Sequence, residues 1–434
     1  MRKKSKALLV TSHPIVDYIK IPFMVVGTST WFSESVEPNA LNANEMVDVS
    51  HIPSIKEWLR NNTIHGIDTE SVGEEKRDGL DPISATSRVL LFQYGTRDKV
   101  VVVQPELITK FKSILESEEY LHVGQNIVHD FKFLLEKYGI HVVRMYDTML
   151  VEQLLTAGLP GVRVGLEDLC RRYPPHVLLS KEVRKQFINF SGKLTREQIL
   201  YAVGDVCNLF DVVDAQTKFI KKNKMELAAQ DEFDCIHVTA EMELTGINVD
   251  EPILRLAISA YEVRAREIEE EAMQIYRHEL KKKGKRANNL FPDFGAVFDM
   301  GSNTQKLEVM RELGFDLDDI QRSTLEAIDH KLAKLMAEYS NCIKMISTYG
   351  ENLLKKRSST SGKIHLEFNQ LGGGNRKGTK NTSGTATGRY SSDGQQMPRP
   401  IERYEVERDP EEAEFFLADE IKRVKETYAN KKSF

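Results

Sequence analysis

Three short segments rich in β-branched and aromatic residues, between positions 64 and 104, constrain the fold more than any other feature. They are Ile64–Glu70, Arg88–Tyr94 and Lys99–Gln104. The turn Gly95–Asp98 joins the last two, which predicts a meander of strands. One further strand-like segment follows at 141–146. Helical patterns cover 108–118, 125–138, 148–155, 166–173 and 195–219. Strands followed by intercalated helices indicate an α/β layer domain over about 55–220.

A charged stretch at Lys221–Lys224 marks the expected end of this domain. The segments after it, at 231–243, 251–283 and 323–356, have helical patterns. We therefore expect a mostly helical second region. The expected organisation is an amino-terminal extension, an α/β domain, a helical region and a charged tail, at 1–55, 56–220, 221–400 and 401–434.

Composition excludes several classes of protein. The chain has 434 residues, of which 41% are hydrophobic, so it can bury real cores and is not disordered throughout. No apolar run approaches the roughly 18 residues of a membrane-spanning helix. The four cysteines are far apart and show neither zinc-ligand spacing nor a disulfide framework. We expect a reduced, cytoplasmic protein that does not act at a membrane.

The net charge of −5 hides a local basic segment. Residues 340–399 contain ten basic and three acidic side chains. A basic segment within an acidic chain is typical of a surface that binds phosphate groups, although a solvated loop explains the charge equally well.

The most informative acidic pair is Asp68-Thr69-Glu70. Alternate residues of a strand project from the same face, so both carboxylates point the same way. Two carboxylates on one face can bind hard cations such as Mg²⁺. Taken alone, such a pair is more often solvent-facing.

Two further pairs lie one helical turn apart. Asn126 and Asp130 share a helix face, and so do Tyr201 and Asp205. Each pair has a purely structural interpretation: Asn126 would cap its helix, and Tyr201 would be half buried beside a surface aspartate.

Together, the three pairs resemble a known nuclease pattern. The order D-x-E, N-x3-D, Y-x3-D resembles the exonuclease motifs of the DEDD family, tyrosine subclass. The segments VGQNIVHDFKFLLEKYGI and YDTML resemble the proofreading domain of family A DNA polymerases, the family of bacterial DNA polymerase I. The resemblance implies a ribonuclease H-like fold, a mixed sheet with flanking helices, and 3′–5′ exonuclease activity.

The resemblance also implies a mechanism and roles for individual residues. Two Mg²⁺ or Mn²⁺ ions about 4 Å apart would hydrolyse the 3′-terminal phosphodiester of single-stranded DNA. Asp68, Glu70 and Asp205 would hold the ion on the nucleophile side. Asp68 would bridge to a second ion, which Asp130 would hold through water. Tyr201 would orient the attacking water, and Asn126 would help position the strand end.

Downstream segments resemble the polymerase region of the same family. They are MELTGINVD, FDMGSNTQKLEVMRELGF and GTATGRYSS, the last matching T-x-T-G-R-x-S-S. The resemblance implies a thumb and the start of a palm, with Thr387 and Arg389 at a primer–template duplex. The basic residues Lys281, Lys282 and Lys283, near the end of a long helix, are further candidates for contacts with the duplex backbone.

The resemblance fades after Ser392. The D-Y-S-Q-I-E, R-x3-K and H-D-E motifs of the polymerase site do not follow, and Gly372–Gly384 intervenes before the T-x-T-G-R segment. We therefore expect no polymerisation from this chain alone, with the palm supplied by a second chain or lost through an interrupted gene. The alternatives are a stand-alone RNase D-like exonuclease acting on RNA, and a non-catalytic nucleic-acid-binding assembly subunit.

Overall fold

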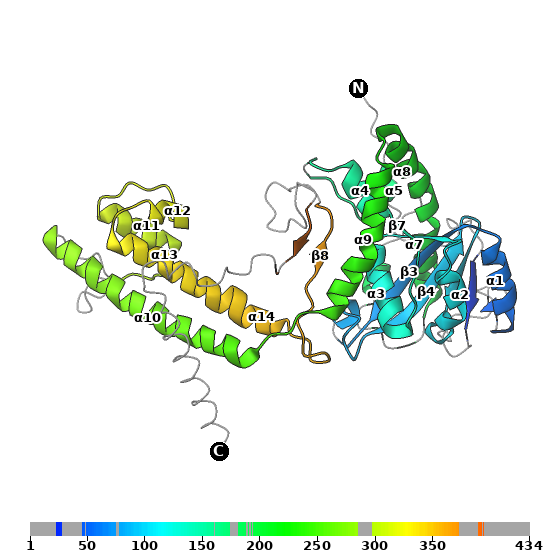
Figure 1. Ribbon diagram of the computed structural model, residues 1–434, viewed down its shortest axis with the longest axis horizontal. Coiled ribbons are helices and arrows are strands. Elements are labelled where there is room, and N and C mark those ends of the chain that lie inside the picture. Colours follow the sequence, from blue (N-terminus) through cyan, green and yellow to red (C-terminus); the bar gives the residue numbers. More distant parts are fainter. Residues whose placement is uncertain are drawn as a thin grey trace, which may run out of the picture. The chain divides into compact units, whose positions relative to one another are not determined.

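The computed structural model forms two compact units. Unit 1 falls within residues 1–247 and 358–395, and unit 2 within 248–357 and 396–434. Figure 1 colours the elements along the chain. The structure describes residues 23–27, 46–47, 49–74, 78–159, 161–173, 181–187, 190, 192, 194–284, 297–372, 389–392 and 394.

Unit 1 is built on a seven-stranded mixed sheet of order β2-β1-β5-β4-β3-β6-β7. Strands β3, β4 and β5 form the antiparallel meander that the sequence predicts, and β6 and β7 continue the sheet in parallel from β3. At the other end, β1 pairs in parallel with β5. The strands are β1 (Phe23–Val26), β2 (Met46–Val47), β3 (Ile64–Val72), β4 (Arg88–Thr96), β5 (Lys99–Val103), β6 (Leu121–Gly124) and β7 (Met145–Asp147).

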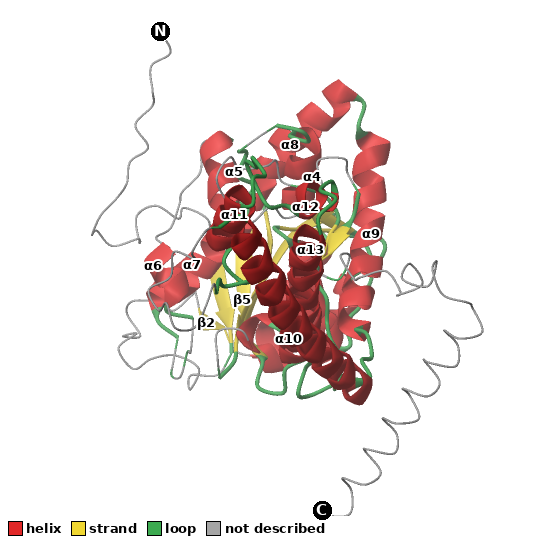
Figure 2. Ribbon diagram, turned by 90° about the vertical axis from the view of Figure 1, so that its left-hand side faces the viewer, coloured by secondary structure: helices red, strands yellow, loops and turns green. Residues whose placement is uncertain are grey.

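Helices cover both faces of this sheet, which confirms the predicted α/β class (Figure 2). On one face, α1, η5, α2, α3 and α9 surround a core that includes Ile67 and Phe131. On the other face, α6 and α7 pack on Leu91 and Val102. The elements are η3 (Val49–His51), α1 (Ile52–Arg60), η4 (Asp78–Leu80), η5 (Pro105–Phe111), α2 (Lys112–Leu115), α3 (Ile127–Tyr138), α4 (Thr148–Leu155), α5 (Leu166–Arg172), α6 (Lys181–Lys185), α7 (Arg196–Cys207), α8 (Leu209–Asn223) and α9 (Glu226–Thr245).

Unit 1 extends beyond the boundary expected near residue 220. The charged stretch is the last turn of α8, and Lys224 ends that helix in a left-handed conformation with φ of 56° just before α9. The apolar residues Ile236 and Ala240 of α9 are fully buried in the core around α3, so α9 stays with the α/β layers (Figure 1). The compact unit therefore reaches Ile247.

A short polymerase-like segment also belongs to unit 1. Strands β8 (Phe368–Asn369) and β9 (Ser391–Ser392) form a small antiparallel sheet. Its flank is fixed to α9, because Gln370 donates to the Glu232 carbonyl oxygen at 2.9 Å. The expected loop 372–384 lies outside the described residues, apart from Gly372.

Unit 2 is helical, as the sequence predicts. Its long helix α10 packs against α13 around a core that includes Ile268 and Met336, and Asp250 caps the start of α10 by accepting from Ile253 N at 3.1 Å. Among the described residues we find no helix long and apolar enough to cross a membrane. The elements are α10 (Glu251–Lys282), α11 (Asn303–Glu312), α12 (Arg322–Glu326), α13 (Lys331–Lys344), η7 (Met345–Glu351) and α14 (Asn352–Lys355). The tail 401–434 lies outside the described residues.

Candidate active site

A glycine on β3 brings helix α7 close to the sheet. Gly66 and Asp68 lie on the same face of the strand because side chains alternate. A Cβ atom on Gly66 would lie 2.8 Å from Val206 Cγ1 and 3.3 Å from the Phe210 ring, both of which follow Asp205 closely in the chain. The bare backbone therefore allows the helix that carries Asp205 to approach the strand that carries Asp68.

Helix α7 is fixed at its start and along its buried face. Thr195 and Gln198 form a capping box, in which the Thr195 side chain accepts from Gln198 N and the Gln198 side chain accepts from Thr195 N. Tyr201 is 8% exposed, and its ring lies 6.0 Å from that of Phe187. One turn later, Asp205 reaches the same cavity as Tyr201.

The structure brings three of the predicted acids together. Carboxylate oxygens of Asp68, Glu70 and Asp205 all lie within 4.8 Å of one another. They line a cavity of about 670 Å³, whose walls also include Asn126 and Tyr201. Such an oxygen-only donor set suits a hard divalent cation.

Burial raises the pKa values of all three acids, and the neighbouring carboxylates raise those of Asp68 and Glu70 further. The pKa of Glu70 rises to about 8, first through desolvation and then through the charge of Asp205. The pKa of Asp68 rises well above its usual range through desolvation and the neighbouring carboxylates. Desolvation also raises the pKa of Asp205 to about 7, against the opposing effect of Arg184. A cation among these carboxylates would relieve the repulsion between them.

Asp130 reaches the cavity from the opposite face of β3. Its Oδ1 accepts from Thr69 N at 2.8 Å and from Thr69 Oγ1 at 2.6 Å. Burial raises its pKa to about 7, although the bonds from Thr69 lower it. Asp130 therefore lines the same cavity but is not one of the three clustered acids.

Asn126 precedes α3 but does not cap it with its side chain. It adopts a left-handed conformation with φ of 59°. The capping oxygens come from Asp147, which accepts from Asn126 N at 3.0 Å and Ile127 N at 2.9 Å. The side chain of Asn126 is exposed at the edge of the cavity.

Asp147 is a structural residue whose role we did not predict from the sequence. It is fully buried, and its carboxylate also caps its own helix α4 by accepting from Met149 N at 2.7 Å. One carboxylate thus accepts hydrogen bonds from backbone N–H groups at the starts of two helices, α3 and α4. Its place in YDTML, directly before a helical segment, was a signal for an N-cap, but the bond to α3 depends on the tertiary structure.

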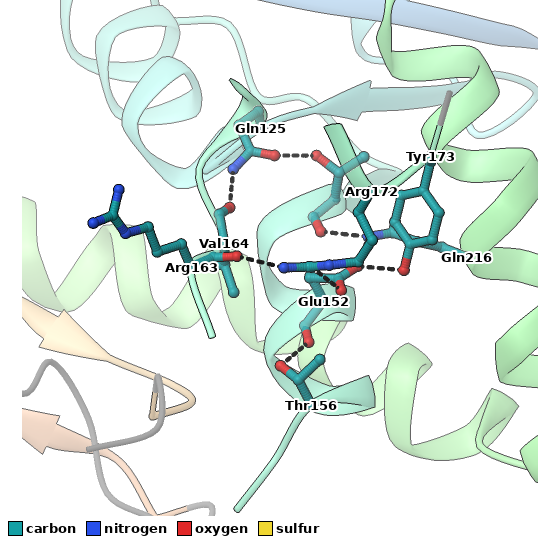
Figure 3. Close-up of polar contacts among 9 residues, drawn as sticks. Gln125, Glu152, Thr156, Arg163, Val164, Arg172, Tyr173 and Gln216 are labelled. Atoms are coloured by element: carbon teal, nitrogen blue, oxygen red, sulfur yellow. Dashed lines mark hydrogen bonds and ion pairs between the residues drawn. The ribbon is translucent and has the colours of Figure 1, made fainter. Parts of the chain in front are cut away.

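Residues 165–168 and Cys170 form another wall of the cavity. The chain on both sides of this wall is held by a polar network, which Figure 3 shows. The carboxylate of Glu152, which is 1% exposed, pairs with Arg172 and accepts from Tyr173 Oη at 2.8 Å and Gln216 Nε2 at 3.0 Å. Gln125 donates to the Val164 carbonyl oxygen at 2.8 Å, which connects this wall to the start of α3.

The predicted duplex contacts are not among the residues that line this cavity. Arg389 is exposed beside β9 in unit 1, and Thr387 lies outside the described residues. Lys281, Lys282 and Lys283 are at the end of α10 in unit 2. Lys282 pairs with Glu279 at 3.2 Å, and Lys283 donates to the Leu313 carbonyl oxygen at 2.5 Å. The contacts of Arg389, Thr387 and these lysines with a duplex stay predictions.

Comparison with known proteins gives consistent results. Residues 53–221 match the family described as 3′–5′ exonuclease. The DNA polymerase I of Borreliella burgdorferi is 25% identical over 308 residues, which cover 68% of this chain and 30% of the relative. That of Chloroflexus aurantiacus is 24% identical over 374 residues, covering 80% of this chain and 36% of the relative. The chain thus spans about a third of the length of these relatives.

A solved structure has a similar fold. It is the POL domain of Pol1 from M. smegmatis in complex with DNA primer-template and dNTP, with a TM-score of 0.56 and 20% identity, covering 80% of this chain and 55% of that one. The match in fold agrees with the match in sequence family. Residues 53–221 are therefore a 3′–5′ exonuclease region of the family A DNA polymerase type.

Proposed function

We propose that the chain removes nucleotides from the 3′ end of single-stranded DNA in a reaction that requires divalent cations, as the proofreading part of a family A polymerase. The observation that carries this proposal is the group of three carboxylates within 4.8 Å of one another, which share one cavity with Tyr201. The exonuclease family match over residues 53–221 supports the direction of cleavage.

The residues present suit two divalent ions. Asp68, Glu70 and Asp205 would hold the first, because their carboxylate oxygens lie within 4.8 Å of one another. Burial raises the pKa values of all three, and neighbouring carboxylates raise those of Asp68 and Glu70 further. Asp130 uses only Oδ1 for its bonds to Thr69, so its other carboxylate oxygen remains for the second ion. When bound, Mg²⁺ or Mn²⁺ would supply Lewis-acid activation of water and stabilise the leaving oxygen.

The protein's own groups would orient the reactants. Burial and the neighbouring acids raise the pKa of Tyr201, so its hydroxyl stays protonated and can hold a water molecule but cannot act as a base. The packing of its ring against Phe187 limits the motion of that hydroxyl. Asn126, exposed at the cavity edge, can donate hydrogen bonds to the terminal nucleotide.

The test uses a 5′-labelled single-stranded oligodeoxynucleotide with Mg²⁺ or Mn²⁺. The wild-type chain should shorten it stepwise from the 3′ end. Asp68→Ala should slow cleavage by more than the roughly 10²–10³-fold typical of losing one electrostatic stabiliser, because an ion is lost too. The matched control is Asp98→Ala, in the exposed turn between β4 and β5. Cleavage near the wild-type rate in Asp68→Ala would contradict the assignment.

The nature of the nucleic acid needs its own comparison. An RNase D-like enzyme would degrade an RNA oligonucleotide faster than DNA of the same sequence, whereas we expect DNA to be preferred. We also propose that a primer–template duplex is contacted by Arg389, Thr387 and Lys281–Lys283.

Templated nucleotide addition would require palm acids from another chain. Co-expression with such a chain should restore nucleotide addition.

A further inference from the structure

Arg184 is a cation in a cavity dominated by acids. The described residues that line the cavity include Arg184 and Lys185 as its basic side chains, against six acidic ones. The acidic ones are Asp68, Glu70, Asp130, Glu167, Asp168 and Asp205. Arg184 lies close enough to the clustered acids that its charge lowers the pKa values of Asp68, Glu70 and Asp205.

Packing fixes the backbone on both sides of Arg184. Val183 is 1% exposed and Phe187 is 3% exposed, and both are buried in the core between α7 and the sheet. The ring of Phe187 also meets that of Tyr201. The short helix α6 is therefore held by its neighbours, while the side chain of Arg184 is exposed and lines the cavity.

The guanidinium group of Arg184 has no hydrogen-bond or ion-pair partner in the part of the chain that the structure describes. Arg172, which follows the cavity-lining residue Cys170 by two positions and does not line the cavity itself, provides the contrast. Its guanidinium pairs with Glu152 and donates to the Arg163 carbonyl oxygen at 2.9 Å, so its role is structural (Figure 3). Arg184 keeps its five N–H donors for a ligand.

We propose that Arg184 binds a backbone phosphate group of the single strand near its 3′ end, an inference that rests on the proposed function. The six acidic side chains that line the cavity would repel a polyanion unless cations offset their charge. Metal ions would neutralise the acids, and a guanidinium fork matches two phosphate oxygens at once. Arg184 is thus a substrate-binding residue, and the metal-binding acids lie beside the phosphate that it holds.

The test measures binding without hydrolysis. A 5′-fluorescein-labelled single-stranded oligodeoxynucleotide is titrated in EDTA across a series of KCl concentrations, with fluorescence anisotropy as the signal. Arg184→Met should weaken binding about tenfold or more. It should also reduce the salt slope by about 0.7, the value for one lost phosphate contact on a single strand. The matched control is Arg60→Met, an exposed arginine at the end of α1, outside the cavity.

Two further measurements distinguish phosphate binding by Arg184 from a general effect of the substitution. Arg184→Lys keeps the charge but lacks the fork, so it should retain the salt slope and bind several-fold more weakly than wild type. With Mn²⁺, Arg184→Met should raise KM more than it lowers kcat. Affinity and slope in Arg184→Met equal to those of Arg60→Met would overturn the proposal. A wild-type chain that binds the strand without cleaving it would contradict only the proposed function.

Discussion

A buried chain of hydrogen bonds beneath the active-site strand predicts how stability depends on pH. His65 Nε2 must donate to the Leu59 carbonyl oxygen at 2.9 Å, because that oxygen can only accept. Burial lowers the pKa of His65, so its ring is neutral and its Nδ1 accepts from Tyr94 Oη at 3.0 Å. The Tyr94 oxygen then accepts from His122 Nε2 at 3.1 Å. His122 Nδ1 is left buried without a partner among the described residues. Both imidazoles are thus neutral in the folded state.

Burial and the neighbouring His65 lower the pKa of His122 to about 3, against about 6.5 in an unfolded chain. Below pH 6.5 the His122 imidazole binds a proton in the unfolded state but stays neutral in the folded state, so the free energy of unfolding falls as pH falls. The loss is about 1.4 kcal/mol per pH unit, or about 2 kcal/mol from His122 between neutral pH and about pH 5. Glu70 and Asp205 act in the opposite direction, because their raised pKa values favour proton uptake by the folded state.

Both His122→Gln and wild type contain Glu70 and Asp205. The difference between their pH-dependent changes in unfolding free energy therefore leaves out the contribution of these acids. Unfolding by guanidinium chloride at about pH 7.5 and about pH 5 is followed by tryptophan fluorescence, to which Trp58 on helix α1 of unit 1 contributes. The variant is expected to be less stable at the higher pH, since a hydrogen bond changes, but to lose about 2 kcal/mol less between the two pH values. His51→Gln, at an exposed position, serves as the control. Equal losses in His122→Gln and wild type would refute the neutral-histidine argument.

Two further predictions concern the site. Because Glu70 and Asp205 have pKa values of about 8 and about 7, binding of Mg²⁺ must displace protons at neutral pH. Mg²⁺ affinity measured by isothermal titration calorimetry should rise steeply from pH 6 to about pH 8.5, and a flat profile would contradict the raised pKa values. Gly66→Ala should destabilise unit 1 by about 1–3 kcal/mol and slow cleavage, because the new methyl overlaps Val206. Gly66→Ala combined with Val206→Ala should recover cleavage, and no recovery would mean that the overlap is not the cause.

The local patterns of the sequence were sufficient for much of the site. The i, i+2 spacing of Asp68 and Glu70 and the i, i+4 spacing of Tyr201 and Asp205 determine which side chains share a face, since both periodicities are properties of one strand or helix. The meander of β3, β4 and β5 also followed from short-range signals. Such inferences need no knowledge of distant residues.

Other features depended on contacts between residues far apart in the chain. The bonds from Thr69 to Asp130 join positions 61 residues apart, and the spacing of N-x3-D contains no sign of them. The same applies to Gly66, whose importance comes from the approach of Val206, and to α9, whose buried residues keep it with unit 1. Arg184 is one of many basic residues in the sequence. Only the packing of Val183 and Phe187 against α7 places it beside the acids, because the tertiary structure decides which surfaces meet.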